Sequence, residues 1–299
     1  MSILVLGTVA LDSVKTPSGA RKNILGGSAA HFAMSARLFT DVHLVAIVGS
    51  DFPKKYIDFL KRKKIDLSSL TVSRGRTFQW KGKYEGDLNT AITLDTRLGV
   101  LPEFRPCVHD AQKKIQFIFL ANVDPDIQRH LLEKVACSAF VGLDSMNYWI
   151  LHRRSSLLRL LKAVDVFVAN DQEARLLSQE ANLIKAAKFL INQGPRIVLI
   201  KKGEHGALLY TKDFIFSLPA YPTDKVVDPT GAGDTFAGGF MGYLASTKRI
   251  NQANLKLATA YGTIAASFNV EDFGLDRTSR LNKRNLGKRL IQFKKYVAF

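Results

Sequence analysis

Short apolar runs alternate with longer amphipathic stretches along most of the chain. Apolar runs of this length are typical of strands covered on both faces, and the stretches with helical periodicity are typical of the helices that cover them. The alternation predicts crossover units and one doubly wound α/β domain with a mostly parallel sheet. The predicted strands are residues 3–6, 42–48, 115–120, 140–143, 164–169 and 197–200, and the predicted helices are residues 29–39, 56–63, 127–135, 157–161, 173–177 and 184–192.

One segment departs from this pattern. Residues 78–84 alternate between apolar and polar positions, a turn follows at Glu85-Gly86-Asp87, and residues 90–94 alternate again, which predicts a hairpin with one apolar face. Residues 12–25 are expected to add strands beside it. We therefore expect a single domain of residues 1–299 with a small β-sheet inserted at about 12–25 and 76–100. This sheet is predicted to be a lid over the site or the contact of a homodimer, and an ordinary edge hairpin is the alternative.

The composition is that of a globular protein from a reducing compartment. Hydrophobic residues make up 46% of the 299 positions and charged residues 23%, which excludes global disorder. The two cysteines, Cys107 and Cys137, are too few for a disulfide scaffold and lack metal-ligand spacing. The N-terminal apolar run is too short for a signal peptide, and no apolar stretch approaches the ~20 residues of a membrane span. We expect a cytoplasmic protein with no membrane partner.

The net charge is strongly positive. The chain has 43 Lys and Arg against 26 Asp and Glu, a formal charge of +17. Such a field attracts anions, so it suits a nucleotide substrate and suits nucleic acid equally. The basic residues are dispersed, and those of residues 280–295 are explained by the solvated face of an amphipathic helix that has Leu286, Leu290 and Phe293 on its other face. Charge alone therefore does not favour a nucleic-acid partner.

The most informative motif is residues 228–234, Asp-Pro-Thr-Gly-Ala-Gly-Asp, which run into a small, apolar stretch expected to be a helix. Gly231 and Gly233 allow the backbone to turn so that successive N–H groups can bind an anion at a helix N-terminus. Asp234 adds a negative charge to the same place, and the chemistry that explains it is acceptance of a proton from a hydroxyl that attacks a phosphoryl group. The alternative is a glycine-rich turn with an acidic residue in the first helical turn. Neither the P-loop nor the dinucleotide glycine pattern is present.

Other polar and glycine residues follow predicted strands, at the edge where open α/β sheets bind ligands. Asp12 follows the first strand, and Gly26 and Gly27 precede a predicted helix, where they would admit a polyol close to the backbone. A flexible helix entry with Ser28 as its N-cap is the alternative.

Residues 170–173, Asn-Asp-Gln-Glu, follow another predicted strand. Asn170 and Glu173 have the oxygen ligands to arrange the waters of a Mg²⁺ ion, which keeps several waters when bound to protein. The alternative is structural, with Asp171 as an N-cap and Glu173 complementing the helix dipole. Residues 202–206 would by themselves be only a turn.

Taken in order along the chain, five of these segments resemble the ribokinase-like (PfkB) carbohydrate and nucleoside kinases. They are Gly7 and Asp12, Gly26-Gly27, Asn170-x-x-Glu173, the turn at Lys202 and Gly203, and the motif at 228–234. The resemblance covers essentially the whole chain. It implies a doubly wound kinase domain with a β lid, which often forms a dimer interface. It also implies that ATP donates its γ-phosphoryl group to a hydroxymethyl group of a small sugar or sugar derivative.

The resemblance also implies roles for single residues. Asp234 would be the catalytic base, and the backbone of Gly231, Ala232 and Gly233 the anion hole for the transferring phosphoryl group. Asn170 and Glu173 would position Mg²⁺ and its waters. Asp12, Gly26 and Gly27 would bind sugar hydroxyls, and Lys202, Gly203 and Thr230 would belong to cofactor-binding segments. Asp228 and Thr230 match positions that in many members help to ligate a monovalent cation, commonly K⁺.

The acceptor is less well determined by these residues. Many sugar-specific members have an Asn after the Gly-Gly pair, whereas this chain continues with Ser28 and His31, which are expected to replace that contact. Asp144 and Asn147, after another strand, are expected to line the acceptor pocket.

Two alternative functions remain open. The missing Asn and the aromatic residues Phe78, Trp80 and Tyr84 of the lid favour a nucleoside kinase of the same fold. A basic nucleic-acid-binding protein with a vestigial kinase site is the third hypothesis. The retention of Asp12, Asn170, Glu173 and Asp234 argues against it.

Overall fold

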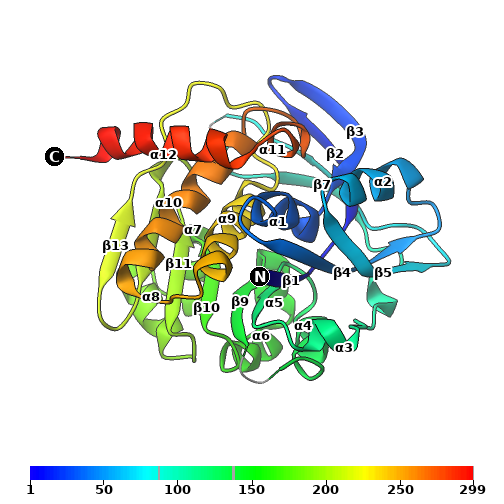
Figure 1. Ribbon diagram of the computed structural model, residues 1–299, viewed down its shortest axis with the longest axis horizontal. Coiled ribbons are helices and arrows are strands. Elements are labelled where there is room, and N and C mark those ends of the chain that lie inside the picture. Colours follow the sequence, from blue (N-terminus) through cyan, green and yellow to red (C-terminus); the bar gives the residue numbers. More distant parts are fainter. Residues whose placement is uncertain (87, 137–138, 299) are drawn as a thin grey trace.

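A large, mostly parallel sheet forms the centre of the molecule (Figure 1). The computed structural model describes residues 1–86, 88–136 and 139–298, and within them nine strands form this sheet. Pairs from β11 to β5 are parallel, and β12 and β13 are antiparallel to their neighbours. The predicted fold class is confirmed. The spatial order is β13 (Ile215–Leu218), β12 (Ala207–Tyr210), β11 (Ile197–Lys201), β10 (Val166–Asn170), β9 (Phe140–Asp144), β8 (Phe117–Leu120), β1 (Ser2–Leu6), β4 (Asp41–Gly49) and β5 (Ile65–Ser73).

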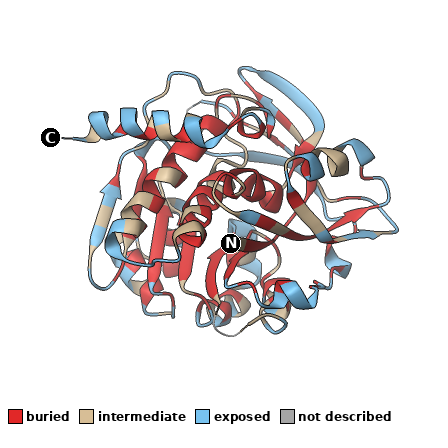
Figure 2. Cartoon of the chain, in the orientation of Figure 1, coloured by how far each residue is buried: buried red, intermediate tan, exposed pale blue. Residues whose placement is uncertain are grey.

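Helices cover both faces of this sheet, so its central strands are buried (Figure 2). Successive residues of a strand point to opposite faces. In β1, Ile3 and Val5 therefore pack in one apolar cluster while Leu4 and Leu6 pack in the other. The first cluster includes α1 (Ser28–Ala36), α2 (Lys54–Arg62), α9 (Ala232–Thr247) and α10 (Gln252–Asn269), and the second includes α4 (Pro125–Leu132), α5 (Asn147–His152), α6 (Arg154–Leu161), α7 (Asp171–Ser178) and α8 (Leu183–Ile191).

Of the remaining helical segments, η1 (Leu101–Glu103) adds Leu101 to the second cluster. The C-terminal helix buries Leu286, Leu290 and Phe293, as its amphipathic pattern predicts. The segments are η1 (Leu101–Glu103), α3 (Asp110–Lys113), η2 (Gly203–His205), α11 (Asp276–Ser279) and α12 (Lys283–Val297). None of the helices formed by the described residues is long and apolar enough to cross a membrane.

The second sheet is built from the two segments that depart from the alternating pattern. Its strands lie in the order β3 (Gly19–Gly26), β2 (Ala10–Thr16), β6 (Gln79–Lys83) and β7 (Ile92–Arg97), with β2 and β6 parallel and the other pairs antiparallel. The apolar residues Ile92 and Leu94 of β7 are 43% and 49% exposed, so this chain does not cover them. Asp87 of the predicted turn lies outside the described residues, as does Cys137, and Cys107 is exposed and free.

Three strands of the large sheet, β5, β12 and β13, are absent from the predicted set. β5 and β13 lie at edges of the sheet, and most of their residues are exposed or half-buried. An edge strand needs little apolar surface, so the buried-run pattern that identifies central strands does not detect it.

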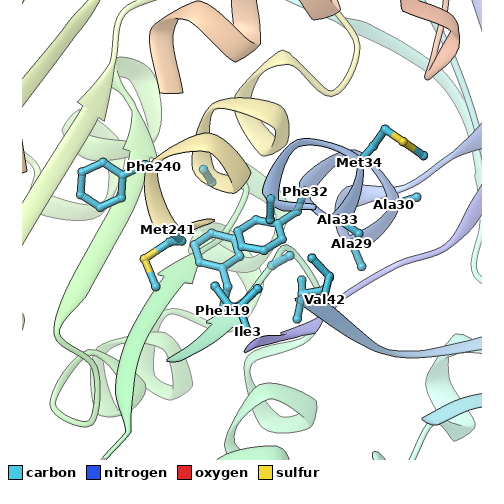
Figure 3. Close-up of a cluster of buried hydrophobic side chains, with 14 of the residues drawn as sticks. Ile3, Ala29, Ala30, Phe32, Ala33, Met34, Val42, Phe119, Phe240 and Met241 are labelled. Carbon is cyan, nitrogen blue, oxygen red and sulfur yellow. The ribbon is translucent and has the colours of Figure 1, made fainter. Parts of the chain in front are cut away.

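Close packing of α9 against its neighbours fixes the position of its N-terminus. A Cβ built at Gly238 would lie 2.3 Å from the carbonyl oxygen of Phe32 in α1, so only glycine allows this approach. The ring of Phe32 in turn stacks on Phe119 of β8 with centroids 4.4 Å apart, beside Met241 of α9 (Figure 3). Because voids and overlaps are both costly in a packed core, α9 has little freedom to shift, and neither has the motif at its start.

Candidate active site

The motif at 228–234 forms the N-terminus of α9. Gly231 has φ +72°, the left-handed region that favours glycine, and it is the N-cap of the helix. The amide of Ala232 donates to the carbonyl oxygen of Pro229 at 3.1 Å. The amides of Gly231 and Gly233 have no acceptor in the part of the chain that the structure describes. Of the three amides predicted for an anion hole, two are therefore open donors at the positive end of a sixteen-residue helix.

Asp234 lies in the first turn of α9 and is half-buried. Burial and the neighbouring carboxylate of Asp144 raise its pKa from 3.8 to about 7, and Lys201 opposes this effect. A carboxylate with a pKa near the working pH can accept a proton and still be ionised in a large fraction of molecules. Asp234 thus lies in the same helical turn as the open amide of Gly233, and its role as a base stays a prediction.

Asp12 and the Gly-Gly pair meet at the end of the small sheet. Asp12 Oδ2 accepts a hydrogen bond from the amide of Gly27 at 3.2 Å, and a Cβ at Gly26 would lie 1.9 Å from the same oxygen. Burial raises the pKa of Asp12 to about 7, with Asp228 and Asp234 adding to the shift and the hydrogen bond from Gly27 opposing it. The structure thus brings the predicted sugar-binding segment to the same site as the predicted base.

Ser28 and His31, the two residues expected to replace the family Asn, are both engaged within the protein. The Ser28 hydroxyl donates to the carbonyl oxygen of Asn122 at 3.0 Å and accepts from the amide of Thr8 at 3.1 Å. His31 is 1% exposed, and burial lowers its pKa, so its ring is neutral. Gly27, and not Ser28, is the N-cap of α1. Their role toward an acceptor stays a prediction.

Asn269, at the end of α10, is a residue that the motifs did not identify. It is fully buried, and its side-chain nitrogen donates to the carbonyl oxygen of Thr230 at 2.8 Å. Its side-chain oxygen accepts from the Thr235 hydroxyl at 2.9 Å and lies 3.2 Å from Nδ1 of His31. The His31 ring packs against Gly231, where a Cβ would lie 2.2 Å from Nδ1. This network joins α1 and α10 to the backbone on both sides of the open amides.

Asn170 and Glu173 form a reciprocal pair at the start of α7. The Asn170 side-chain oxygen accepts from the Glu173 amide, and Glu173 Oε2 accepts from the Asn170 amide, each at 2.7 Å. Asn170, and not Asp171, is therefore the N-cap. Burial and Asp144 raise the pKa of Glu173 to about 7, and Lys201 opposes the shift.

The oxygen ligands of this pair fit a hydrated Mg²⁺ ion. The capping bonds fix both side chains and leave the second carboxylate oxygen, Oε1, without a partner among the described residues. A carboxylate that burial makes difficult to ionise gains stability from a nearby hard cation. Among the described residues there is no group of three or more His, Cys, Asp or Glu side chains that could hold a metal directly. The fit is thus to an ion that keeps most of its waters.

Asp228 is fully buried behind the motif. Its two carboxylate oxygens accept from the amides of Thr230 at 2.9 Å and Gly274 at 3.0 Å. No Lys, Arg or His of the described residues forms an ion pair with it. Among the described residues, its hydrogen-bond donors are therefore backbone amides alone.

Lys201, next to the predicted Lys202, belongs to a cluster of charged residues with Asp144, Glu173 and Asp234. Lys201 ends β11, and its Nζ lies 2.8 Å from Oδ2 of Asp144, the last residue of β9. A Cβ at Gly233 would lie 2.9 Å from Nζ of Lys201. Asp144 is among the residues expected to line the acceptor pocket, and Lys201 could have been singled out in the same way, since it too ends a parallel strand at the ligand-binding edge of the sheet.

The small sheet contacts the site at two places. The Thr230 hydroxyl donates to the hydroxyl of Tyr84, a buried residue that follows β6, at 3.3 Å. Further along, the side-chain nitrogen of Asn89 donates to Glu204 at 3.0 Å, and a Cβ at Gly203 would lie 2.5 Å from the Asn89 side-chain oxygen. The segment between β6 and β7 therefore reaches the turn that contains Lys202 and Gly203.

The arrangement of these elements agrees with the family match. Residues 4–280 match the model of the pfkB family carbohydrate kinases, and the chain belongs to this family. It is therefore a kinase, as the sequence predicts. Kinases of this family use ATP and a divalent metal ion.

The relatives with a named substrate include both nucleoside kinases and sugar kinases. A cytidine kinase of Thermococcus kodakarensis is 29% identical over 250 residues, covering 81% of this chain and 87% of the relative. A ribokinase of Staphylococcus aureus is 34% identical over 120 residues, covering 38% of each chain. The crystal structure of a Methanocaldococcus jannaschii nucleoside kinase has a TM-score of 0.79 at 24% identity, covering 97% of this chain and 98% of the other.

Proposed function

We propose that this protein transfers the γ-phosphoryl group of ATP to the hydroxymethyl group of a small sugar or sugar derivative, with Asp234 as the base. The observation that carries the proposal is the place of Asp234, whose pKa is raised to about 7, in the same helical turn as the open amides of Gly231 and Gly233. A proton acceptor and an anion site are thus held next to each other. Phosphoryl transfer needs little more from a protein than this positioning and charge stabilisation.

The roles of the chain's own residues follow from that geometry. Asp12 and the Gly26-Gly27 backbone hold the acceptor, and Asp234 takes the proton from its hydroxyl. The hydroxyl oxygen then bonds to the γ-phosphorus while the bond between that phosphorus and the bridging oxygen breaks, which releases ADP. The amides of Gly231 and Gly233 stabilise negative charge on the transferring group, as preformed donors do in other anion holes.

Two cations complete the proposal. Asn170 and Glu173 would hold Mg²⁺ through its waters, and when bound the ion neutralises phosphate charge. Asp228 and Thr230 would contribute to a K⁺ site, because the buried carboxylate of Asp228 has no ionic partner among the described residues. Lys202, Gly203 and Thr230 are proposed to contact the nucleotide.

A nucleoside is the second candidate acceptor. The relatives named as cytidine or nucleoside kinases match 81–88% of this chain, whereas the Staphylococcus aureus ribokinase matches 38%. A ribokinase of Lactococcus lactis, however, matches 91% of it at 23% identity. Both candidates present a hydroxymethyl group to the same base, so the proposed chemistry is common to them.

The small sheet is proposed to be a lid over the acceptor and the interface of a homodimer. Its contacts with Thr230 and Glu204, through Tyr84 and Asn89, place it beside the site. The exposed Ile92 and Leu94 of β7 would be covered by a second copy.

The experiment is a screen for ADP release with sugars, sugar acids, sugar phosphates and nucleosides, each with and without K⁺. We expect turnover with sugars or nucleosides that depends on Mg²⁺ and is lost in the Asp234→Asn variant. Turnover with nucleosides alone would replace the sugar with the second candidate. No ADP release with any of these acceptors would overturn the proposed function.

A further inference from the structure

Lys201 lies in a largely enclosed part of the site. Its side chain is 16% exposed and that of its partner Asp144 is 3% exposed, with Nζ and Oδ2 2.8 Å apart. The absence of a side chain at Gly233 is what makes room for the ammonium group, because a Cβ there would lie 2.9 Å from Nζ. The cation is therefore in contact with one of the two residues whose amides are open.

The ammonium group of Lys201 has N–H donors that no acceptor among the described residues uses. A lysine ammonium carries three N–H groups, and in the described residues only Asp144 accepts from Lys201. Burial opposes the charge of Lys201, but Asp144 and Glu173 outweigh it, so its pKa is above the usual value and the group stays charged. A half-buried ammonium group with two unused donors is stabilised when an anionic oxygen accepts from them.

We propose that Lys201 donates these hydrogen bonds to the terminal phosphate of the nucleotide that occupies the anion site at Gly231 and Gly233, and that Asp144 positions it. The inference rests on the proposed function and adds a side-chain cation to a site so far made of backbone amides. Charge-assisted hydrogen bonds to phosphate are stronger than neutral ones, so this contact contributes to nucleotide binding as well as to turnover.

A purely structural role for Lys201 makes a different prediction. In that role the lysine only neutralises Asp144, whose charge otherwise acts on Asp234 and Glu173. Removing both charges together would then restore a functional site. If Lys201 binds phosphate, the loss of its positive charge cannot be corrected by the loss of the Asp144 charge.

The variants are Lys201→Met, Asp144→Asn with Lys201→Met, and Lys212→Met as a matched control. Lys212 lies exposed in the turn between β12 and β13, so its substitution makes the same charge change away from the site. Isothermal titration with Mg²⁺ measures the affinity of each variant for ADP and for a non-hydrolysable ATP analogue, and thermal unfolding confirms that each variant is folded.

We expect Lys201→Met to weaken binding of the ATP analogue on the order of 10- to 100-fold, which is the range of charge-assisted hydrogen bonds, and to change ADP binding by less than about threefold. The double variant should remain as weak as Lys201→Met, and Lys212→Met should bind like the wild type. An equal loss for ADP and the ATP analogue, or recovery in the double variant, would overturn the role of Lys201. If the wild type binds neither nucleotide, the proposed function itself fails, and Lys201 has no terminal phosphate to bind.

Discussion

Replacing Asp234 with Asn should make the protein more stable and inactive at the same time. The pKa of Asp234 is raised from 3.8 to about 7, first by burial and then by Asp144. The folded protein therefore holds a proton that the unfolded chain releases between about pH 4 and pH 7, so stability falls as pH rises through this window. Above pH 7 the ionised carboxylate destabilises the fold in full.

The magnitude follows from the shift. Each pKa unit corresponds to about 1.4 kcal/mol, which sets an upper limit of about 4 kcal/mol at pH 8. Because water reaches part of the half-buried side chain, we expect Asp234→Asn to raise the free energy of unfolding by about 2 kcal/mol at pH 8. The gain should disappear near pH 4, where the folded and unfolded states are both protonated.

Activity should change in the opposite direction. A general base contributes at least about 100-fold to turnover, so the variant should lose at least this factor in kcat. In the wild type, kcat/KM should fall about tenfold per pH unit below about pH 7, because only ionised Asp234 accepts the proton.

Urea unfolding at pH 5, 6, 7 and 8 measures the first effect, and ADP release measures the second. The control is Asp213→Asn, which removes an exposed carboxylate from the turn between β12 and β13 and should leave both quantities unchanged. A variant that turns over at close to the wild-type rate would refute the assignment of the base. A variant that is less stable than the wild type at pH 8 would refute the electrostatic reasoning.

Three further substitutions test other parts of the site. Gly231→Ala should abolish most activity and destabilise the fold by about 1–2 kcal/mol, because φ is +72° and a Cβ would overlap the His31 ring. The control Gly287→Ala, in open space on α12, should be neutral or slightly stabilising. Thermal unfolding and ADP release compare the two variants. Asn269→Ala should lower the free energy of unfolding in urea by about 1–3 kcal/mol, because its buried partners lose their hydrogen bonds. The variant should also lower kcat more than it raises KM. Unchanged kcat would exclude a role of Asn269 in positioning the amides. Glu173→Gln should raise the Mg²⁺ concentration for half-maximal activity at least about tenfold, and an unaltered Mg²⁺ titration would exclude Glu173 from the metal site.

Much of the fold could be predicted because it depends on local patterns. The six predicted strands and six predicted helices are all present to within a few residues, since buried parallel strands and their covering helices have distinct periodicities. The edge strands β5 and β13 have weaker patterns and were not predicted. The spatial order of the strands in the sheet also cannot be predicted from periodicity, because it depends on which surfaces pack together.

In the candidate site too, some residues could be predicted from the sequence and others could not. The motif at 228–234 indicates an anion site and a base because its glycines allow backbone amides to face an anion at a helix start, and a carboxylate beside them can accept a proton. Asn269 carries no such signal, since a buried Asn at the end of a helix is recognised only when its three partners are in place. Lys201 and Lys202 are adjacent and chemically alike, and only the direction of the strand's last side chain separates them.

The sequence by itself determined the α/β class and the small inserted sheet, because both follow from residue types at short spacing, and the resemblance of its motifs to the ribokinase-like kinases indicated the kinase chemistry. Only the tertiary structure decided which charged side chains lie close together. Asp12, Glu173, Lys201 and Asp234 come from separate strands and helices, and burial together with charged neighbours shifts the pKa of each. Such through-space effects depend on distance and solvent exclusion, which appear only when the chain is folded.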